Sequence, residues 1–397
     1  MSAPTIPANR RDSAAALWGA GIVLIGVVSL LGWGLSRFPG WDAWPSYETW
    51  AGDLTSPLNW ALWVIGDTNE APFYKSALAG IGMTLGALLA HVLWRRRSRA
   101  MGIPVSYGSG RLPWILVASW VSLILANGMW QWTISDEFPW QPTFVTFVSV
   151  PAAVVLVYGG GWARALTAAV LGAVLTTPIS ILTVMYVCTP LELPSVVGNV
   201  TGMWAGGLIA FALCRRLPHM ARTTEPADED AGPPAAPSIQ TPGWVVRRAL
   251  ADFTEPTFYG NEWASAGLLL GATLEFLLNP ASPVYGSGLF PGVLAAQFIA
   301  ATLGVLLFRR QWAEKGFYST FIPIVSIAPA LVVTFGSAPL VVAVAGVLGA
   351  LAGPPLGDVL SRVLPPDFHP YIAYVFAMTV SVAVLVPLLR AVPGFGP

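Results

Sequence analysis

Residues 148–179 read VSVPAAVVLVYGGGWARALTAAVLGAVLTTPI, and residues 325–356 read VSIAPALVVTFGSAPLVVAVAGVLGALAGPPL. The two stretches align without gaps at a constant offset of 177, and 11 of the 32 positions are identical. The identities include Gly159 with Gly336, residues 170–173 with 347–350, and Pro178 with Pro355. Small apolar residues often match by chance in such segments, so the shared glycines and prolines carry more weight. Together they predict a duplicated unit inside a hydrophobic chain.

The composition predicts a membrane protein. Hydrophobic residues make up 55% of the 397 residues, charged residues only 10%, whereas ordinary soluble domains have about 25% charged residues. Several apolar stretches reach the ~20 residues that a helix needs to cross a bilayer. The short alternating segments of a membrane barrel are missing from the sequence. We therefore expect an all-α, polytopic membrane helical bundle.

The positions of the apolar stretches predict about eleven spans. They lie at 14–36, 75–94, 112–131, 142–160, 164–187, 195–214, 262–279, 290–308, 317–335, 338–353 and 370–390. The first stretch, 14–35, is too long and continuous for a cleaved signal peptide, whose apolar core has about 7–15 residues. Cys188 and Cys214 lie near opposite ends of neighbouring spans, so we expect no disulfide between them.

The charges between the spans predict an orientation. Arginine and lysine cluster before the first span and after the second, sixth and eighth, on one side under this count. Because short cytoplasmic loops carry an excess of such residues, we expect a multi-pass protein of the cell membrane with a cytoplasmic N-terminus. Residues 215–258 are polar and rich in proline, which predicts a flexible cytoplasmic linker. It would join an N-terminal unit, 1–214, to a C-terminal unit, 259–397.

The loop at 37–71 is unusually rich in tryptophan. Its apolar stretch at 57–66 is too short to span a bilayer and fits an interfacial or re-entrant segment. Tryptophan favours the headgroup level, so one interpretation is a helix that shields the outer face. A lid over a substrate entrance is the alternative.

A second, looser match aligns Pro72–Tyr74 with Pro283–Tyr285. With this pairing the span at 112–131 has no counterpart, so the first unit has six spans and the second has five. Part of the first unit would then be inverted relative to the second, as in many secondary transporters. The alternative is that residues 338–353 enter the membrane and return.

The matched glycines and prolines predict helix breaks. One break includes Thr176, Thr177 and Pro178, and the other runs from Gly353 to Asp358. Proline removes an amide donor and opposes the carbonyl four residues before it. Backbone freed in this way at membrane depth lines a cavity or is buried in protein, so Thr176, Thr177 and Asp358 are candidate binding residues. The alternative is that each span simply ends there.

Single polar residues within apolar spans are further candidates. Glu275 lies inside the span at 262–279, where a carboxylate usually faces a cavity; the alternative places it at the outer interface. His91 and Gln297 occupy similar places in the two looser copies, and interhelical hydrogen bonding is their alternative role. Asn199 and His369 lie near the start of the closing spans and would add polar groups to a shared pocket.

The sequence contains no Walker loop, dinucleotide-binding glycine pattern, zinc-protease motif or serine-hydrolase elbow. We expect no cofactor and no metal site, and the formal net charge of zero argues against nucleic acid as a partner. The first hypothesis is a secondary transporter, not an enzyme, that moves a small polar or organic solute, with ion coupling through Glu275 or the breaks. Membrane lipid and the solute are the expected partners, and a homodimer is compatible with the sequence.

Two other classes remain open. One is a membrane-embedded enzyme acting on a lipid-linked substrate, with acidic residues of the outer loops at the interface: Asp67, Glu70, Asp136 and Glu137. The other is a non-catalytic membrane subunit of a larger complex.

Overall fold

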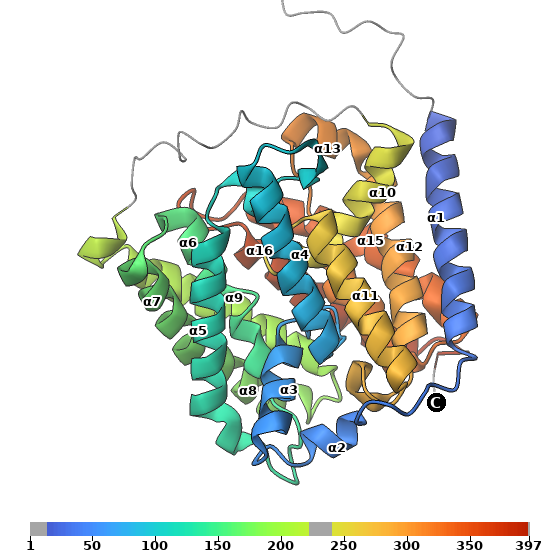
Figure 1. Ribbon diagram of the computed structural model, residues 1–397, viewed down its shortest axis with the longest axis horizontal. Helices are drawn as coiled ribbons and strands as arrows, with labels where there is room; N and C mark the ends of the chain where they lie inside the picture. Colours follow the sequence, from blue (N-terminus) through green and yellow to red (C-terminus); the bar gives the residue numbers. More distant parts are fainter. Residues whose placement is uncertain (1–13, 222–239, 396–397) are drawn as a thin grey trace, which may run out of the picture.

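The computed structural model describes residues 14–221 and 240–395, and over these residues the regular structure is entirely helical. Eight helical segments are long and apolar enough to cross a membrane. They are α1 (Ala14–Leu35), α4 (Ala77–Arg95), α5 with the turn after it (Leu112–Thr133), the continuous helix from α7 through α8 (Trp162–Cys188), α9 (Ser195–Cys214), α12 (Phe290–Leu307), α15 (Pro339–Ser361) and α16 (Tyr371–Arg390). The chain is a polytopic helical bundle, as its composition predicts (Figure 1).

Three of the eleven expected spans are not among these eight helices. The span at 262–279 is α11 (Glu262–Leu278), which has 17 residues, and the other two contain shorter helices. Residues 142–160 contain a 3₁₀ turn, Thr143–Thr146, and then α6 (Val150–Tyr158). Residues 317–335 contain a 3₁₀ turn, Ile322–Val325, and then α14 (Ile327–Phe335). Each short helix follows a serine with non-helical backbone angles: φ −145° and ψ −114° at Ser149, φ −146° and ψ −81° at Ser326. The helix is therefore interrupted at these serines: the single 3₁₀ turn before each serine does not continue into the α-helix after it.

The proline-containing segments behave differently from the predicted breaks. The helix from α7 to α8 continues through Pro178 by widening into π-helical turns at Gly172–Thr176 and Val184–Cys188. The α15 helix includes both Pro354 and Pro355 and extends to Ser361. Residues 338–353 therefore belong to a full-length helix and do not return to the side from which they entered.

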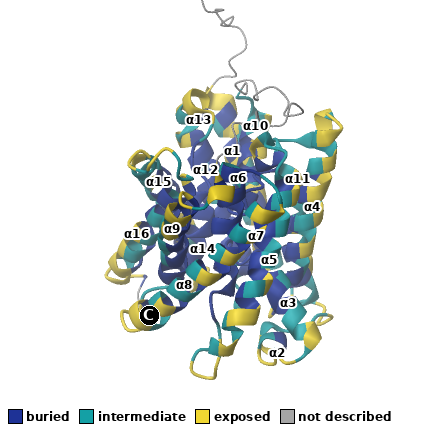
Figure 2. Ribbon diagram, turned by 90° about the vertical axis from the view of Figure 1, so that its left-hand side faces the viewer, coloured by how far each residue is buried: buried dark blue, intermediate teal, exposed yellow. Residues whose placement is uncertain are grey.

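Helices α4 and α11 (Glu262–Leu278) form an antiparallel pair, which Figure 1 shows side by side and Figure 2 shows at one edge of the bundle. Each helix carries two glycines four residues apart: Gly82 and Gly86 in α4, Gly267 and Gly271 in α11. A Cβ at Gly82 would lie 2.2 Å from the carbonyl oxygen of Gly267, and one at Gly267 would lie 2.0 Å from that of Gly82. The backbones are therefore in direct contact, as in other small-residue membrane interfaces.

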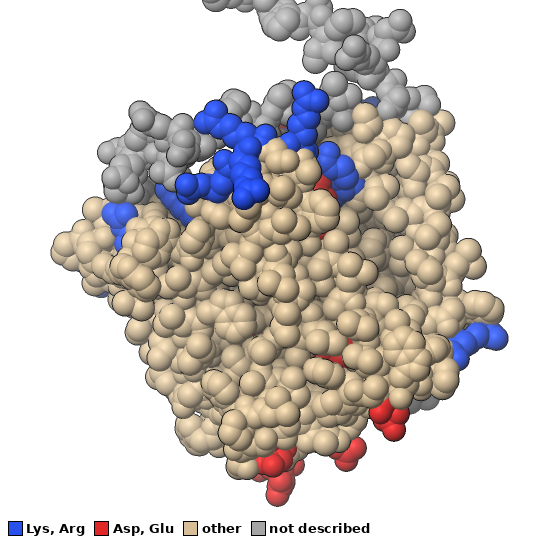
Figure 3. Space-filling view, in the orientation of Figure 1, with Lys and Arg blue, Asp and Glu red and all other residues tan. Residues whose placement is uncertain are grey.

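Basic and acidic residues gather at opposite ends of the bundle (Figure 3). We call the end where α4 finishes and α13 (Arg309–Lys315) lies the basic end. The acidic end is the one with α2 (Tyr47–Ala51) and α3 (Pro57–Asp67). Buried residues fill the middle between these ends (Figure 2).

The expected linker at 215–258 is wrong at its C-terminal boundary. Residues 222–239 lie outside the described residues, but from Gln240 onward the chain is folded. Helix α10 (Pro242–Ala251) packs against α1, α11 and α12 and buries Arg248. The sequence is polar there because the segment carries buried charged groups, not because it is a tether.

The tryptophan-rich loop is also more than an interfacial cover. Its backbone is fixed to the end of α11, because Trp41 N donates to Leu277 O at 3.0 Å and Tyr47 N donates to Ala281 O at 2.7 Å. Helix α3 packs against α4 and α5, and its Trp63 is fully buried.

Candidate central cavity

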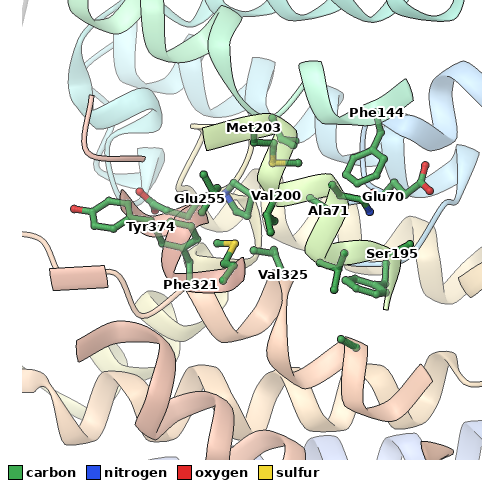
Figure 4. Close-up of a pocket in the computed structure, with 18 of the residues that line it drawn as sticks. Glu70, Ala71, Phe144, Ser195, Val200, Met203, Glu255, Phe321, Val325 and Tyr374 are labelled. Carbon is green, nitrogen blue, oxygen red and sulfur yellow. The ribbon is translucent and has the colours of Figure 1, made fainter. Parts of the chain in front are cut away.

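A cavity of about 650 Å³ that is partly open to the surface lies between the helices of the described structure. Eleven of its lining residues are aromatic: Tyr47, Phe73, Tyr107, Trp140, Phe144, Phe258, Tyr285, Phe317, Phe321, Tyr371 and Tyr374. Its two carboxylate side chains are Glu70 and Glu255. Figure 4 shows Glu70 on one side and Glu255 on the other, with Met203 between them.

Glu70 belongs to a buried charge cluster at the acidic end. Lys75 lies between Asp67 and Glu70, with its Nζ 2.8 Å from Glu70 Oε2 and hydrogen-bonded to Asp67 Oδ1. All three side chains are 0% exposed. Thr143 Oγ1 donates to Asp67 Oδ2 at 2.7 Å, and Trp63 Nε1 donates to Thr143 at 3.2 Å. The amine of Lys75 also lies 3.7 Å from the centre of the Trp63 ring.

Glu255 belongs to a second cluster, at the basic end. Arg248 Nη2 lies 2.7 Å from Asp252 Oδ1 and 2.8 Å from Glu255 Oε2. Thr320 Oγ1 donates to Asp252 Oδ2 at 2.7 Å, and Trp312 Nε1 donates to Thr320 at 3.3 Å. The guanidinium of Arg248 lies 4.7 Å from the centre of the Trp312 ring. These are the same links as at the acidic end: tryptophan to threonine to aspartate, and a cation between aspartate and glutamate.

The two clusters are only partly built from corresponding residues. Asp67 and Glu70 correspond to Asp252 and Glu255 at an offset of 185, and Thr143 corresponds to Thr320 at an offset of 177. The cations and tryptophans do not correspond. At the same offset of 185, Trp63 aligns with Arg248, and Lys75 aligns with Gly260. The second tryptophan comes instead from α13. The same network is therefore present at both ends although different positions supply two of its members.

Aromatic rings surround each glutamate. At the basic end Tyr107 packs against Phe317 with ring centres 6.2 Å apart, and Tyr374 lies 6.0 Å from Phe317 and 5.8 Å from Phe321. We call these four rings the basic-end box. Figure 4 shows Glu255 close to Tyr374 and Phe321.

The acidic-end box contains Tyr285, Trp140, Phe144 and Tyr47 around Glu70. The ring centres of Trp140 and Tyr285 are 6.3 Å apart, and those of Tyr47 and Tyr285 are 5.8 Å apart. The hydroxyl of Tyr285 donates to Glu70 Oε1 at 3.1 Å. Three rings of this box correspond by position to rings of the other one. The fourth, Tyr47, is the first residue of α2.

Backbone details match between the segment containing α3 to α9 and the segment containing α10 to α16. Left-handed φ angles occur at Phe73 (68°) and at Phe258 (61°). Reciprocal hydrogen bonds join the segments: Ser106 N donates to Tyr259 O at 2.9 Å, and Val284 N donates to Tyr74 O at 2.7 Å. Further matches precede the short helices, where Ser149 Oγ donates to Val145 O and Ser326 Oγ donates to Ile322 O.

Two of the predicted site residues line the cavity. Asn199, on α9, is buried, and its Oδ1 has no hydrogen-bond partner within the described part of the chain. His369 lies just before α16, with its ring 5.4 Å from that of Phe258. Burial lowers the pKa of His369 to about 4, so its imidazole is neutral near pH 7.

Glu275 and Gln297 are buried but lie outside the cavity lining. Glu275 accepts hydrogen bonds from Ser76 Oγ at 2.8 Å, Leu78 N at 3.0 Å and Ser282 Oγ at 2.8 Å. Ser76 is the N-cap of α4, so this carboxylate stabilises the start of a helix, where negative charge is favoured. Gln297 bonds Tyr74 OH, Pro72 O and Ile324 O and joins the two chain segments.

The other predicted site residues also lie elsewhere. His91 stacks on Trp94 at 5.7 Å between ring centres. Thr176 donates to Gly172 O within its own helix, and Thr177 is buried beside it. Asp358 is ion-paired with Lys315 and Arg362 near the surface of the basic end. The prolines were a misleading signal, because both helices continue through them: the α7–α8 helix widens into π-helical turns, and α15 includes Pro354 and Pro355 as an α-helix.

Several cavity residues had signals that the prediction did not use. Asp67-x-x-Glu70-x-x-Phe73-Tyr74 and Asp252-x-x-Glu255-x-x-Phe258-Tyr259 share one pattern. Among the outer-loop acids considered for an enzyme, Asp67 and Glu70 are buried in the cluster, whereas Asp136 and Glu137 are exposed. In the described ranges, no group of three or more His, Cys, Asp or Glu residues is placed to hold a metal ion.

The chain matches no known family model, no curated protein and no solved structure.

Proposed function

We propose that this protein is a membrane transporter in which two inverted copies of one unit enclose a shared solute cavity. One copy comprises α3 to α9 and the other α10 to α16. The supporting observation is the repeated network of tryptophan, threonine, aspartate, cation and glutamate at the two ends of one cavity. Inverted repeats with a site between them are the architecture of many secondary transporters.

The directions of the helices support the inversion. Each cluster immediately precedes one helix of the antiparallel pair: Lys75 precedes α4, and Glu255 precedes α11. Because those helices run in opposite directions, the clusters lie at opposite ends of the bundle. The alignment favoured here pairs α5 with α12, since the turns before both helices read Pro-Val-(Ser)-Tyr-Gly-Ser-Gly. It replaces the looser pairing, which left residues 112–131 without a counterpart.

The expected ion coupling through Glu275 is not retained in this proposal, because that carboxylate caps α4. An enzyme acting at the headgroup level is also less well supported, since Asp67 and Glu70 are ion-paired and fully buried. In a cell membrane the basic end would face the cytoplasm, because basic residues gather there (Figure 3).

Flux through the purified protein tests the proposal. Proteoliposomes are mixed with small neutral, cationic or anionic solutes, and swelling is followed by light scattering. We expect at least one solute class to enter faster than it enters protein-free liposomes. Substitution Met203→Trp, in the cavity lining, should abolish that difference.

The matched control is Leu270→Trp on α11, where the side chain is 70% exposed on the outside of the bundle. Its flux should equal that of the unmodified protein. If no solute class enters faster than in protein-free liposomes, or if Met203→Trp leaves the flux unchanged, the proposal is wrong.

A further inference from the structure

We infer that the solute is a small organic cation, which one glutamate and its aromatic box bind at either end of the cavity. This inference rests on the proposed function, because it names the substrate class of the same cavity. Two independent features support it: the charge balance of the clusters and the arrangement of the rings.

Each cluster has one positive charge fewer than its carboxylates require. The acidic-end cluster holds Asp67 and Glu70 against Lys75 alone, and the basic-end cluster holds Asp252 and Glu255 against Arg248 alone. With all groups ionised, each cluster carries a net charge of −1. Buried charge without a counterion is strongly unfavourable, so a positive charge supplied from the cavity would stabilise the cluster.

The glutamates are the members that can reach such a ligand. In each, Oε2 is paired with the cluster's own cation, and Oε1 is the other acceptor. Glu70 Oε1 accepts from Trp140 Nε1 and from Tyr285 OH, whereas Glu255 Oε1 has no hydrogen-bond partner in the described residues. Glu255 lines the cavity beside Tyr107, whose phenol interacts with its carboxylate. We assign Oε1, which is not paired with Arg248, as the binding point for a cationic group.

The rings supply the second feature. A cation over aromatic faces is attracted by their quadrupoles, and aromatic cages are the usual way to bind quaternary ammonium groups. The basic-end box has four rings beside Glu255, and the acidic-end box has four beside Glu70. At the acidic end, the position that corresponds to Tyr374 is Val197, which has no ring. Tyr47, which lies outside the matched segments, supplies the fourth ring instead. The ring number is thus the same at both ends despite different origins.

Among the described residues that line the cavity, no side chain gives an anion a comparable site. Lys75 and Arg248 are each bound by two carboxylates, and His369 is neutral near pH 7. A neutral solute would leave the charge of each cluster unbalanced. When the cavity is empty, a proton on one carboxylate restores neutrality, so protons and the organic cation compete.

The groups that influence this competition come from several elements. Around Glu255 they are Arg248, Asp252, Tyr107 and Tyr374; around Glu70 they are Lys75, Asp67, Tyr285 and Tyr47. When a cation binds, the carboxylate releases its proton to water. Affinity for the cation should therefore fall as the pH is lowered.

Binding to the full chain in lipid nanodiscs tests the inference without requiring transport. The probes are choline and its uncharged carbon isostere, in which a quaternary carbon replaces the nitrogen, and calorimetry measures both. We expect choline to bind at least about tenfold more tightly than the isostere, from charge pairing together with cation–π attraction. Tyr374→Leu and Glu255→Gln should each weaken choline binding without a matching effect on the isostere.

Tyr186→Leu is the matched control, because that ring is 70% exposed and lies outside the cavity. Equal binding of choline and isostere, or no choline binding by the folded protein, overturns the inference, as does unchanged binding in Tyr374→Leu. Selective choline binding by a protein that passes no solute supports the substrate class and removes the transport proposal, so the two can fail separately.

Discussion

Removing the amine of Lys75 should destabilise the protein strongly. In Lys75→Met the side chain keeps much of its apolar length, but Asp67 and Glu70 lose their shared cation while remaining buried, each at 0% side-chain exposure. Breaking a buried ion pair by removing one partner typically costs about 3–5 kcal/mol. The contact of the amine with the Trp63 ring, at 3.7 Å, is lost in addition. We therefore expect a loss of at least ~3 kcal/mol in the free energy of unfolding.

The measurement is unfolding by SDS in mixed micelles, followed by circular dichroism. Lys315→Met is the matched control, because Lys315 pairs with Asp358 at exposures of 37% and 19%. Such partly exposed pairs contribute about 0–1 kcal/mol. A second substitution, Asp67→Asn in the Lys75→Met background, should restore part of the stability by removing one uncompensated charge. A loss below ~1 kcal/mol in Lys75→Met would refute the charge argument.

Three further predictions concern packing, capping and pH. Gly267→Ala should lower the unfolding free energy, because the new methyl would meet the carbonyl oxygen of Gly82 at 2.0 Å. The control, Gly128→Ala, has no atom within 4 Å of the new methyl and should raise the unfolding free energy by up to about 1 kcal/mol. Equal effects of the two substitutions in SDS titration would contradict the close α4–α11 contact. Glu275→Gln should reduce stability and leave solute flux per folded molecule unchanged, and lost flux at unchanged stability would restore a transport role for this residue. The pKa of His369 in the folded protein, about 4, is below the ordinary value of 6.5. Between these two pH values the unfolded chain binds more protons than the folded chain, so the unfolding free energy should fall as the pH decreases from 6.5 to 4. His369→Gln should flatten that part of the curve of stability against pH.

The sequence predicted the spanning helices well. The predicted span at 195–214 coincides with α9, and the first span, 14–36, differs from α1 by one residue. These helices are continuous apolar stretches, for which length alone is informative. The predicted spans at 142–160 and 317–335 were too long for one reason. The backbone angles at Ser149 and Ser326 interrupt the helix there, and hydropathy does not indicate backbone angles.

The cavity was predicted less completely, for two physical reasons. Prolines inside spans indicated the wrong place, because the two glutamates of the cavity lie in the short connections before α4 and α11. Their shared pattern, from Asp67 to Tyr74 and from Asp252 to Tyr259, was available in the sequence. The contacts of Lys75 with Trp63 and of Arg248 with Trp312 could not be predicted from the sequence, because these residues do not occupy corresponding positions. Only the folded chain brings each pair together.

In the proposed transporter, two copies of one unit, inverted relative to each other, enclose the cavity. Ser109 and Ser287 test it most directly, because they occupy corresponding turns before α5 and α12, where each hydroxyl accepts from the amide two residues later. Each is replaced by cysteine in turn and treated with a membrane-impermeant thiol reagent added to one side of sealed vesicles; the natural Cys188 and Cys214 are buried. If the two copies are inverted, the reagent labels the two positions from opposite sides of the membrane. Labelling of both from the same side would contradict it.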